Sequence, residues 1–180
     1  PGPLTLWYRQ PALHWLEAVP LGNGRLGAMV FGVPLEERIV LNDDTLYSGE
    51  PGSRDIPLDI TKDFDHVTAM IRNGQYHEAD EYITKHWLGR AQPCYQPLGE
   101  LRIRFAPVHE VGGYQRELDL ATALARVRYI YSGVRFEREF FTSHPGNILA
   151  MRFGGDAPGR ISFRVSLVSP HPNLKTEPEA

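Results

Sequence analysis

The chain has 180 residues, 42% of them hydrophobic and 23% charged, and carries a formal net charge of -3 at pH 7. This length suits one globular domain that folds without disulfides. The slight acidic excess argues against nucleic acid or an anionic membrane surface as the main partner. No apolar run approaches the roughly 18 residues of a membrane span. Because the chain starts at Pro1, without Met or a signal-like segment, we expect a mature or excised piece, and the compartment stays open.

The first predicted element is a short aromatic strand over residues 4–9, which Pro11 ends because proline cannot donate to a β-ladder. Trp15 follows, before the chain becomes rich in glycine. Its large side chain is either an anchor in a core or domain interface, or an aromatic platform of the kind that stacks on sugars. The sequence leaves both interpretations open.

Residues 19–49 form a glycine-rich stretch around which the rest of the chain is organised. Its glycines predict a constrained bend, which leads into a strand over residues 26–31. A second apolar run, residues 38–41, is also typical of a strand, and strand ends followed by loops often carry functional groups. The polar residues at this strand end are Asn42, Asp43, Asp44 and Thr45.

Two helices are predicted after an exposed loop at residues 50–59. Apolar residues recur at helical spacing from Thr61, the expected N-cap, to Gly74, the expected C-terminal stop. A second amphipathic helix is predicted over residues 75–88, ending before a glycine. The pair forms a helical hairpin over about residues 61–89, which we expect to cover an edge or a face of a sheet.

Nearly every segment after Leu98 alternates between apolar and polar residues, which indicates half-buried strands. The expected strands cover residues 101–105, 114–120, a hairpin over 125–143 that turns at Ser132-Gly133, 147–153 and 161–167. The last strand places four apolar side chains on one side: Ile161, Phe163, Val165 and Leu167. We therefore predict a mainly β fold, an antiparallel, supersandwich-like β-sandwich with an inserted helical hairpin.

An arginine interrupts one face that the pattern marks as buried. Arg138 is in phase with Val134 and Phe140 in its strand. Either that face is exposed, or the guanidinium pairs with a carboxylate, for which Glu117 and Asp119 of the preceding strand are the candidates.

Two carboxylate doublets, Glu36-Glu37 and Asp43-Asp44, are the candidates for glycoside hydrolysis, which needs two carboxyl groups flanking a sugar bond. Adjacent strand residues point to opposite faces, so at most one of each doublet can serve a site. The seven histidines show no metal-binding spacing, and GNGRLG lacks the βαβ context of a dinucleotide site. We predict no metal and no cofactor. Cys94, the single cysteine, excludes an internal disulfide and is expected to be buried.

Four segments together resemble one known family. They are WLEAVPLGNGRLGAMVFG, ERIVLNDDTLYSG, YQPLGELRIRF and YQRELDLATALARVRYIYSGVRFEREFFTSHPGNILAMRF. In order and spacing they are similar to the N-terminal β-domain of glycoside hydrolase family 95, the α-L-fucosidase family, over residues 7–170. One segment departs from the family's usual LNEDTLW, because this chain has the shorter acid Asp43 and has Tyr47 in place of tryptophan.

The resemblance implies a β-sandwich followed by a helical linker and an (α/α)6 barrel that holds the active site and hydrolyses with inversion. It carries no catalytic residue onto this sequence, so we expect the chain alone to be inactive. We expect residues 1–172 to form the N-terminal domain, including the hairpin, and residues 173–180 to begin the linker to the absent barrel.

The resemblance also suggests that the glycine-rich bend forms the joint with the barrel of the same parent chain. The residues expected to bind this partner or a substrate are Trp15, Asn23, Arg25, Asn42, Asp43 and Thr45. One alternative is a module that binds a fucosylated glycan through Trp7, Trp15, Trp87 or the Tyr129 and Tyr131 stripe. The other is a self-contained glycosidase that uses two carboxylates.

Overall fold

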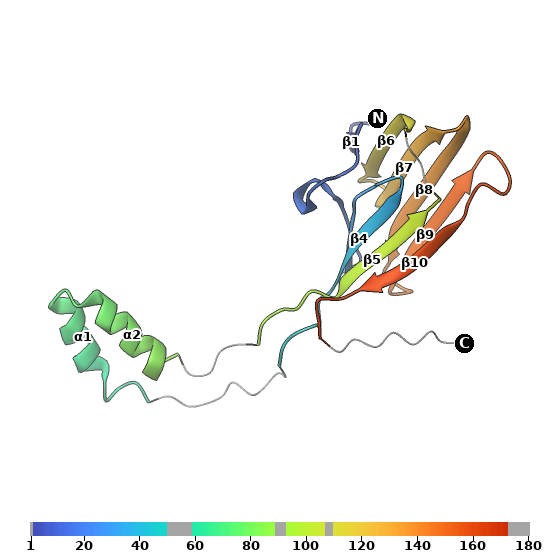
Figure 1. Ribbon diagram of the computed structural model, residues 1–180. Coiled ribbons are helices and arrows are strands. Elements are labelled where there is room, and N and C mark those ends of the chain that lie inside the picture. Colours follow the sequence, from blue (N-terminus) through green and yellow to red (C-terminus); the bar gives the residue numbers. More distant parts are fainter. Residues whose placement is uncertain (1, 50–58, 89–92, 107–109, 173–180) are drawn as a thin grey trace. The chain divides into compact units, whose positions relative to one another are not determined.

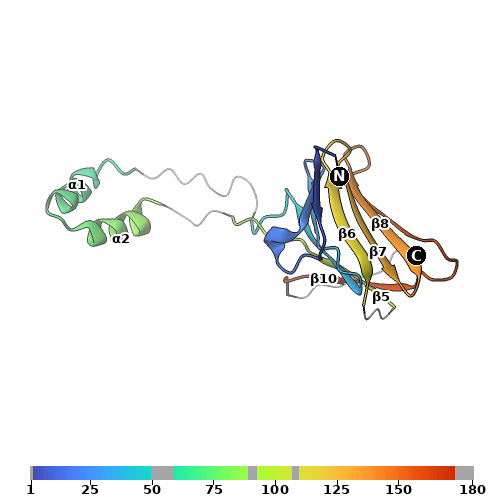
Figure 2. The ribbon, with the colours of Figure 1, turned by 90° about the horizontal axis from the view of Figure 1, so that it is seen from above.

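Two five-stranded antiparallel sheets make up most of the computed structural model, which describes residues 2–49, 59–88, 93–106 and 110–172. In spatial order, the first sheet consists of β1 (Thr5–Tyr8), β6 (Gly112–Asp119), β7 (Leu124–Tyr131), β8 (Val134–Ser143) and β9 (Ile148–Gly155). The second consists of β10 (Phe163–Val168), β5 (Gly99–Phe105), β4 (Glu36–Asp43), β3 (Leu26–Val30) and β2 (Val19–Gly22). The two sheets lie as two layers (Figures 1 and 2). The predicted antiparallel sandwich with an inserted helical hairpin is confirmed.

The chain divides into two compact units. The sandwich unit contains Pro1–Leu46 and Pro97–Ala180, and the insertion between them, Tyr47–Gln96, is the second unit. The expected linker at residues 173–180 and most of the expected loop at 50–59 lie outside the described residues.

The second unit contains the predicted helical hairpin, formed by α1 (Phe64–Arg72) and α2 (Tyr76–His86). Val67 and Ala79 are its buried residues. The rings of Phe64 and Trp87 stack with their centroids 6.4 Å apart. That the hairpin covers part of a sheet stays a prediction.

The expected helix stop at Gly74 is confirmed, because this residue follows the C-cap Asn73 with a φ of 76°. The expected N-cap at Thr61 is wrong. The amide of Thr61 donates to the Asp59 carboxylate at 3.1 Å, which forms a local turn, and α1 begins only after Asp63.

The core lies between the two sheets and follows the alternation within each strand. In β4, for example, Glu37 and Ile39 point inward and are fully buried, whereas Arg38 points outward. The buried apolar side chains of this core are Val19, Leu21, Ala28, Val30, Ile39, Ile103, Leu118, Ala125, Val127, Tyr129 and Phe140. The β7–β8 turn at Ser132 and Gly133 has positive φ at both residues, as a tight two-residue hairpin turn requires.

Sequence patterns missed β2, which we interpreted as part of the glycine bend. Val19 and Leu21 of this strand are buried, and Pro20 between them is tolerated because β2 is the last strand of its sheet. The expectation that Cys94 is buried is also wrong. Cys94 is exposed, because it lies beside the short Tyr47–Tyr95 bridge of the second unit and outside both core clusters.

Arg138 is buried and binds across the sandwich to the opposite sheet. Its Nη1 lies 3.2 Å from Glu37 Oε2 on β4, and its Nη2 donates a hydrogen bond to the Tyr129 hydroxyl oxygen at 2.8 Å. Arg138 also donates to the backbone carbonyls of Val33, at 2.9 Å, and Pro34. Of the two alternatives that the sequence left open for Arg138, the structure shows the pairing with a carboxylate.

The partners that we expected for Arg138 are wrong. Glu117 instead pairs with Arg126 and Arg128, at 3.7 and 3.2 Å, and Asp119 accepts a hydrogen bond from the Ala121 amide. The physical reason is that an inward-pointing side chain faces the other layer, so its ion-pair partner comes from the opposite sheet.

Candidate functional site

The glycine-rich bend joins β2 to β3 and is held by the side chain of Asn23. The Asn23 Oδ1 accepts hydrogen bonds from the amides of Arg25 and Leu26, at 3.0 and 2.7 Å. Asparagine suits this position because its short amide can bond the backbone two or three residues further along. Its Nδ2 donates to the carbonyl of Ser143 on β8 at 2.8 Å, so the bend is tied to the first sheet.

Arg25 and the end of β4 form a charged cluster beside this bend. Arg25 Nε lies 3.2 Å from Asp43 Oδ2, and the Arg25 carbonyl accepts from the Asp44 amide at 3.0 Å. The other oxygen of Asp43 accepts from the Thr45 amide at 3.0 Å and from the Thr45 hydroxyl at 2.5 Å. These bonds from Thr45, with a smaller effect of Arg25, lower the pKa of the Asp43 carboxyl.

Asn42 lies opposite Gly27 in the β3–β4 ladder. A Cβ atom at Gly27 would lie 3.4 Å from the Asn42 Cβ, which is the lower limit of ordinary van der Waals contact. The structure therefore brings Asn23, Arg25, Asn42, Asp43 and Thr45 to one end of the sandwich unit, and we call this group the bend cluster.

Trp15 does not belong to the bend cluster. It lies in the short 3-10 helix Trp15–Glu17, which precedes Val19, whereas the bend follows the other end of β2 at Gly22. Its exposed fraction is 54%, so it is not a core anchor of this chain. The platform or interface role of Trp15 stays a prediction.

Sequence reasoning missed two contacts of the bend cluster. The carbonyl of Ser143 and the side chain of Asn147 both bind Asn23, the latter at 3.3 Å. Asn147 has a positive φ of 46°, which is typical of asparagine in turns, so its turn was predictable from SHPGN. Its contact with a residue 124 positions away was not, because only the stacking of the two sheets creates it.

The two carboxylate doublets do not form a hydrolytic pair. Glu36 points outward to Arg102 and Arg104, whereas Glu37 is fully buried and accepts from the Gly32 amide at 2.6 Å. Burial raises the pKa of Glu37, and Arg138 opposes this effect. Glu37 is thus enclosed between the sheets and has no access to a substrate.

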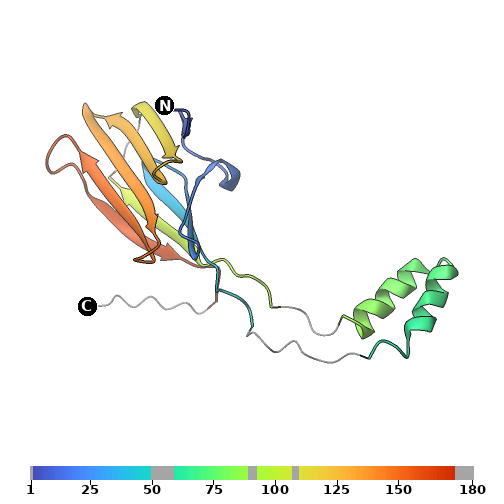
Figure 3. The ribbon, with the colours of Figure 1, turned by 180° about the vertical axis from the view of Figure 1, so that it is seen from behind.

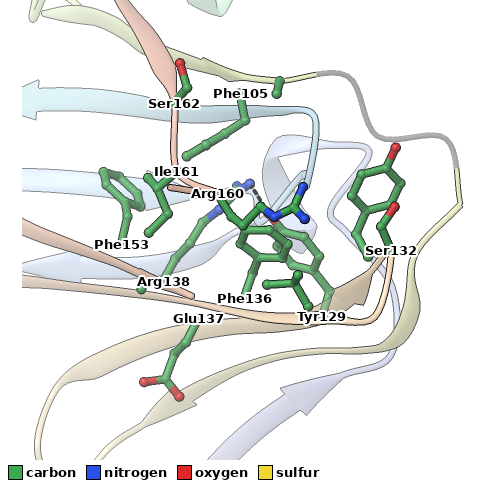
Figure 4. A pocket seen from close by; sticks show the side chains of 14 residues that line it. Phe105, Tyr129, Ser132, Phe136, Glu137, Arg138, Phe153, Arg160, Ile161 and Ser162 are labelled. Carbon is green, nitrogen blue, oxygen red and sulfur yellow. Dashed lines mark hydrogen bonds between the residues drawn. The ribbon is translucent and has the colours of Figure 1, made fainter. Parts of the chain in front are cut away.

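A cavity of about 270 Å³ lies between the sheets near Arg138 (Figure 4). Aromatic side chains dominate its lining, namely Phe105, Tyr129, Tyr131, Phe136 and Phe153. Arg160, Ser132 and Ser162 supply polar groups around it. The Arg138 guanidinium carbon lies 3.8 Å from the Phe105 ring centroid, which is a cation–π contact inside the core.

Within the described ranges, no group of three or more His, Cys, Asp and Glu side chains could hold a metal ion. Among the described residues, no helix is long and apolar enough to cross a membrane.

Comparison with known proteins identifies the family. The profile described as "Glycosyl hydrolase family 65, N-terminal domain" matches residues 6–180. The chain belongs to this family. The expected resemblance to an N-terminal β-domain of glycoside hydrolases is thereby confirmed.

Three curated relatives of this family member carry fucosidase names. "Alpha-L-fucosidase 2" of Arabidopsis thaliana is 35% identical over 187 residues, which cover 99% of the chain and 21% of that protein. "Probable alpha-fucosidase A" of Aspergillus niger is 30% identical, over 94% of the chain and 23% of that protein. The protein of the same name from Aspergillus oryzae is 25% identical over 78% of the chain. The chain thus spans about a fifth of the length of these relatives.

Proposed function

We propose that this chain is the non-catalytic N-terminal domain of an α-L-fucosidase-like glycoside hydrolase, and that it packs on and positions the catalytic part of the same polypeptide. The parent reaction would be hydrolysis of terminal α-L-fucosyl linkages with inversion, in an (α/α)6 barrel. The family membership and the names of the three relatives support this proposal.

The non-catalytic role is inferred from the surroundings of two carboxyl groups, those of Glu37 and Asp43. An inverting hydrolase needs a protonated acid and an ionised base that face each other across the sugar. In the described part of the chain, Glu37 is buried against Arg138, and Asp43 has a lowered pKa and is bound by Arg25 and Thr45. Neither carboxyl can act as an acid on a bound glycoside.

The position of the bend cluster supports its role as the joint. Asp43 ends β4 at the same end of the second sheet at which β5 begins with Gly99. β10 ends there too, since Val168 pairs with Glu100 (Figure 3). The described chain therefore leaves the sandwich at the end that carries the bend cluster, where a following domain can be reached.

The chemistry of the bend cluster suits a polar contact. The Arg25 side chain is 56% exposed. Its guanidinium can therefore donate hydrogen bonds to a partner while it keeps its ion pair with Asp43. Asn23 and Thr45 hold the backbone around this pair, so the donors are fixed before the partner docks.

The test uses the full-length polypeptide and a chromogenic α-L-fucoside or 2′-fucosyllactose. We expect Arg25→Ala and Asp43→Ala each to lower kcat/KM by about tenfold, because the catalytic part is then less well positioned. This change corresponds to a loss of about 1.4 kcal/mol of transition-state stabilisation. Arg104→Ala is the matched control, because Arg104 is also a surface arginine paired with one carboxylate, Glu36, and it should leave kcat/KM unchanged.

Two outcomes would contradict the proposal. One is hydrolysis of either substrate by the 180-residue chain alone, in which case Asp43→Asn should abolish turnover if two carboxylates act. The other is that the Arg25 and Asp43 variants match the Arg104 control.

The alternative of a carbohydrate-binding module gains no support from the Tyr129 and Tyr131 stripe that we expected as one possible platform. Tyr129 is buried, and Tyr131 lines the internal cavity, so their stripe faces inward. Trp7 and Trp15 are partly exposed. A saturable change in tryptophan fluorescence on titration with fucosylated oligosaccharides would favour the carbohydrate-binding module.

A further inference from the structure

One side of the sandwich leaves core-type residues only partly covered. Phe163, Val165 and Leu167 of β10 pair with Phe105, Ile103 and Leu101 of β5, and therefore lie on the face of the sheet that points to the core. Ile103 is 1% exposed, whereas the three β10 side chains are 46%, 50% and 56% exposed. We call Phe163, Val165 and Leu167 the β10 row. The sequence pattern predicted its shared face correctly, but the described chain covers this row only in part. The Phe163 ring packs on Phe105 and Phe153, with centroids 5.7 and 5.3 Å apart, and about half of each side chain in the row stays exposed.

β10 is also the last strand of its sheet, so its outer edge carries backbone groups without a neighbouring strand in the described structure (Figure 1). Natural edge strands usually carry charges, prolines or bulges that block pairing with another strand. β10 carries one charge, Arg164, which lies on the outward face, whereas the β10 row has no charge, proline or bulge and the register with β5 is continuous over all six residues. The inward face of this edge therefore carries none of the features that block pairing.

The opposite layer is open at the same side. β9 is the last strand of the first sheet, and Met151 is 37% exposed although it pairs with the buried Phe140. The cavity between the layers is lined there by Phe153 of β9 and by Phe105 and Ile161 (Figure 4). Both sheets thus end in incompletely covered apolar side chains, with a cavity between them.

We propose that further β-strand segments of the same polypeptide, C-terminal to residue 180, pair with the free edge of β10 and bury the β10 row. The curated relatives are about five times as long as the matched stretch, so ample chain exists to supply them. Consecutive strands usually lie side by side in a sheet. Because β5 occupies one edge of β10, a strand that follows β10 in the sequence can pair with it only along its outer edge. The occupant should alternate, with apolar residues facing the β10 row.

A tethered segment is a better occupant than a second copy of the chain, because attachment to the end of β10 gives it a high effective concentration. The sandwich then extends beyond residue 172, the boundary that we predicted from the sequence. This inference rests on the proposed function only in so far as the chain belongs to a longer polypeptide.

The test compares two lysine substitutions in the full-length polypeptide. Val165→Lys places a charge in the β10 row, whereas Val168→Lys places the same residue on the outward face of the same strand, opposite Glu100. We expect Val165→Lys to lower Tm by at least about 5 °C and Val168→Lys by no more than about 1 °C. If Val165→Lys yields no folded protein, Val165→Ser replaces it and should still lower Tm by about 3 °C.

Hydrogen exchange provides a second readout that needs no variant. Amides of β10 should exchange at least about 100-fold more slowly in the full-length polypeptide than in the 180-residue chain. Equal exchange in the two, or equal Tm values for the two lysine variants, would overturn the proposal. A full-length dimer that Val165→Lys converts to a monomer would also overturn it, in favour of a second copy. Neither readout uses fucosidase activity, so failure here is distinct from failure of the proposed joint.

Discussion

Glu37 and Arg138 join the two sheets through an ion pair that is shielded from water. Their side chains are 0% and 2% exposed, and each keeps additional hydrogen bonds to backbone or to Tyr129. Such a pair is weak evidence for net stabilisation, because desolvation of both charges opposes their attraction. Loss of one partner, in contrast, leaves the other charge buried alone.

We therefore expect Glu37→Gln to lower the free energy of unfolding by about 3–5 kcal/mol, as measured by urea denaturation. Glu36→Gln is the matched control, since the neighbouring carboxylate lies on the outer face, and it should cost no more than about 1 kcal/mol. The double variant Glu37→Leu with Arg138→Met should be more stable than Glu37→Gln. A similar loss for Glu36→Gln and Glu37→Gln would contradict this account.

Gly32 shows a second constraint at the scale of one residue. Its φ is 77°, and a Cβ atom there would lie 2.6 Å from the Tyr114 hydroxyl and 3.3 Å from Val127 Cγ2. We expect Gly32→Ala to cost about 3 kcal/mol of unfolding free energy, from backbone strain and overpacking together. Gly24→Ala should cost only about 1 kcal/mol, because Gly24 has a positive φ but open space around it. Equal chemical-denaturation midpoints for the two variants would argue against the close approach.

At the scale of elements, the outer face of β7, β8 and β9 carries a row of cross-strand charges. Glu139 on β8 receives hydrogen bonds from Arg152 on β9 at 2.7 Å and from Arg126 on β7 at 3.0 Å. These bonds, chiefly the one from Arg152, hold the pKa of Glu139 below its ordinary value of 4.5. Three strands are thus linked by one carboxylate.

The lowered pKa gives this row a defined pH dependence. A carboxyl whose pKa is lower in the folded state stabilises the fold above its unfolded pKa, and this contribution is lost as the pH falls through the folded pKa. We expect Glu139→Gln to lower unfolding free energy by about 1 kcal/mol at pH 7. The difference from wild type should shrink below pH 4.5 and vanish at more acidic pH. Denaturant titrations at several pH values check this, and a difference that persists undiminished at pH 2 would contradict it.

The strands themselves were predictable where alternation was continuous, as in β5, β7 and β8. β2 was not, because Pro20 and Gly22 are unfavourable to a strand in general and are tolerated here only at the edge of a sheet. β10 was predicted as a strand with one apolar face, and this is correct, but its exposure depends on which strands surround it.

At the scale of the whole molecule, the chain consists of two compact units. All residues of both core clusters of the sandwich lie outside Tyr47–Gln96. The second unit relies on two short helices, of 9 and 11 residues, and helices this short are marginal without packing.

We therefore expect two unfolding transitions on heating, with the helical unit melting first. Val67→Asp should abolish the first transition, because Val67 is a buried contact residue of the hairpin, and should leave the second Tm unchanged. Circular dichroism at 222 nm reports the helices, and fluorescence of the two sandwich tryptophans, in a Trp87→Phe background, reports the sandwich. A single transition that Val67→Asp shifts as a whole would show that the two units unfold together.

The sequence by itself determined the fold class, the inserted hairpin and the family, because periodicity and ordered motifs are properties of local sequence. It also pointed to residues that the structure gathers at one end of the sandwich, namely Asn23, Arg25, Asn42, Asp43 and Thr45. Only the tertiary structure decided that Glu37 is the partner of Arg138, that Trp15 lies away from the bend cluster and that the β10 row is about half exposed. These depend on which layer faces which, and that is set by packing between strands up to 124 residues apart, as in the contact of Asn23 with Asn147.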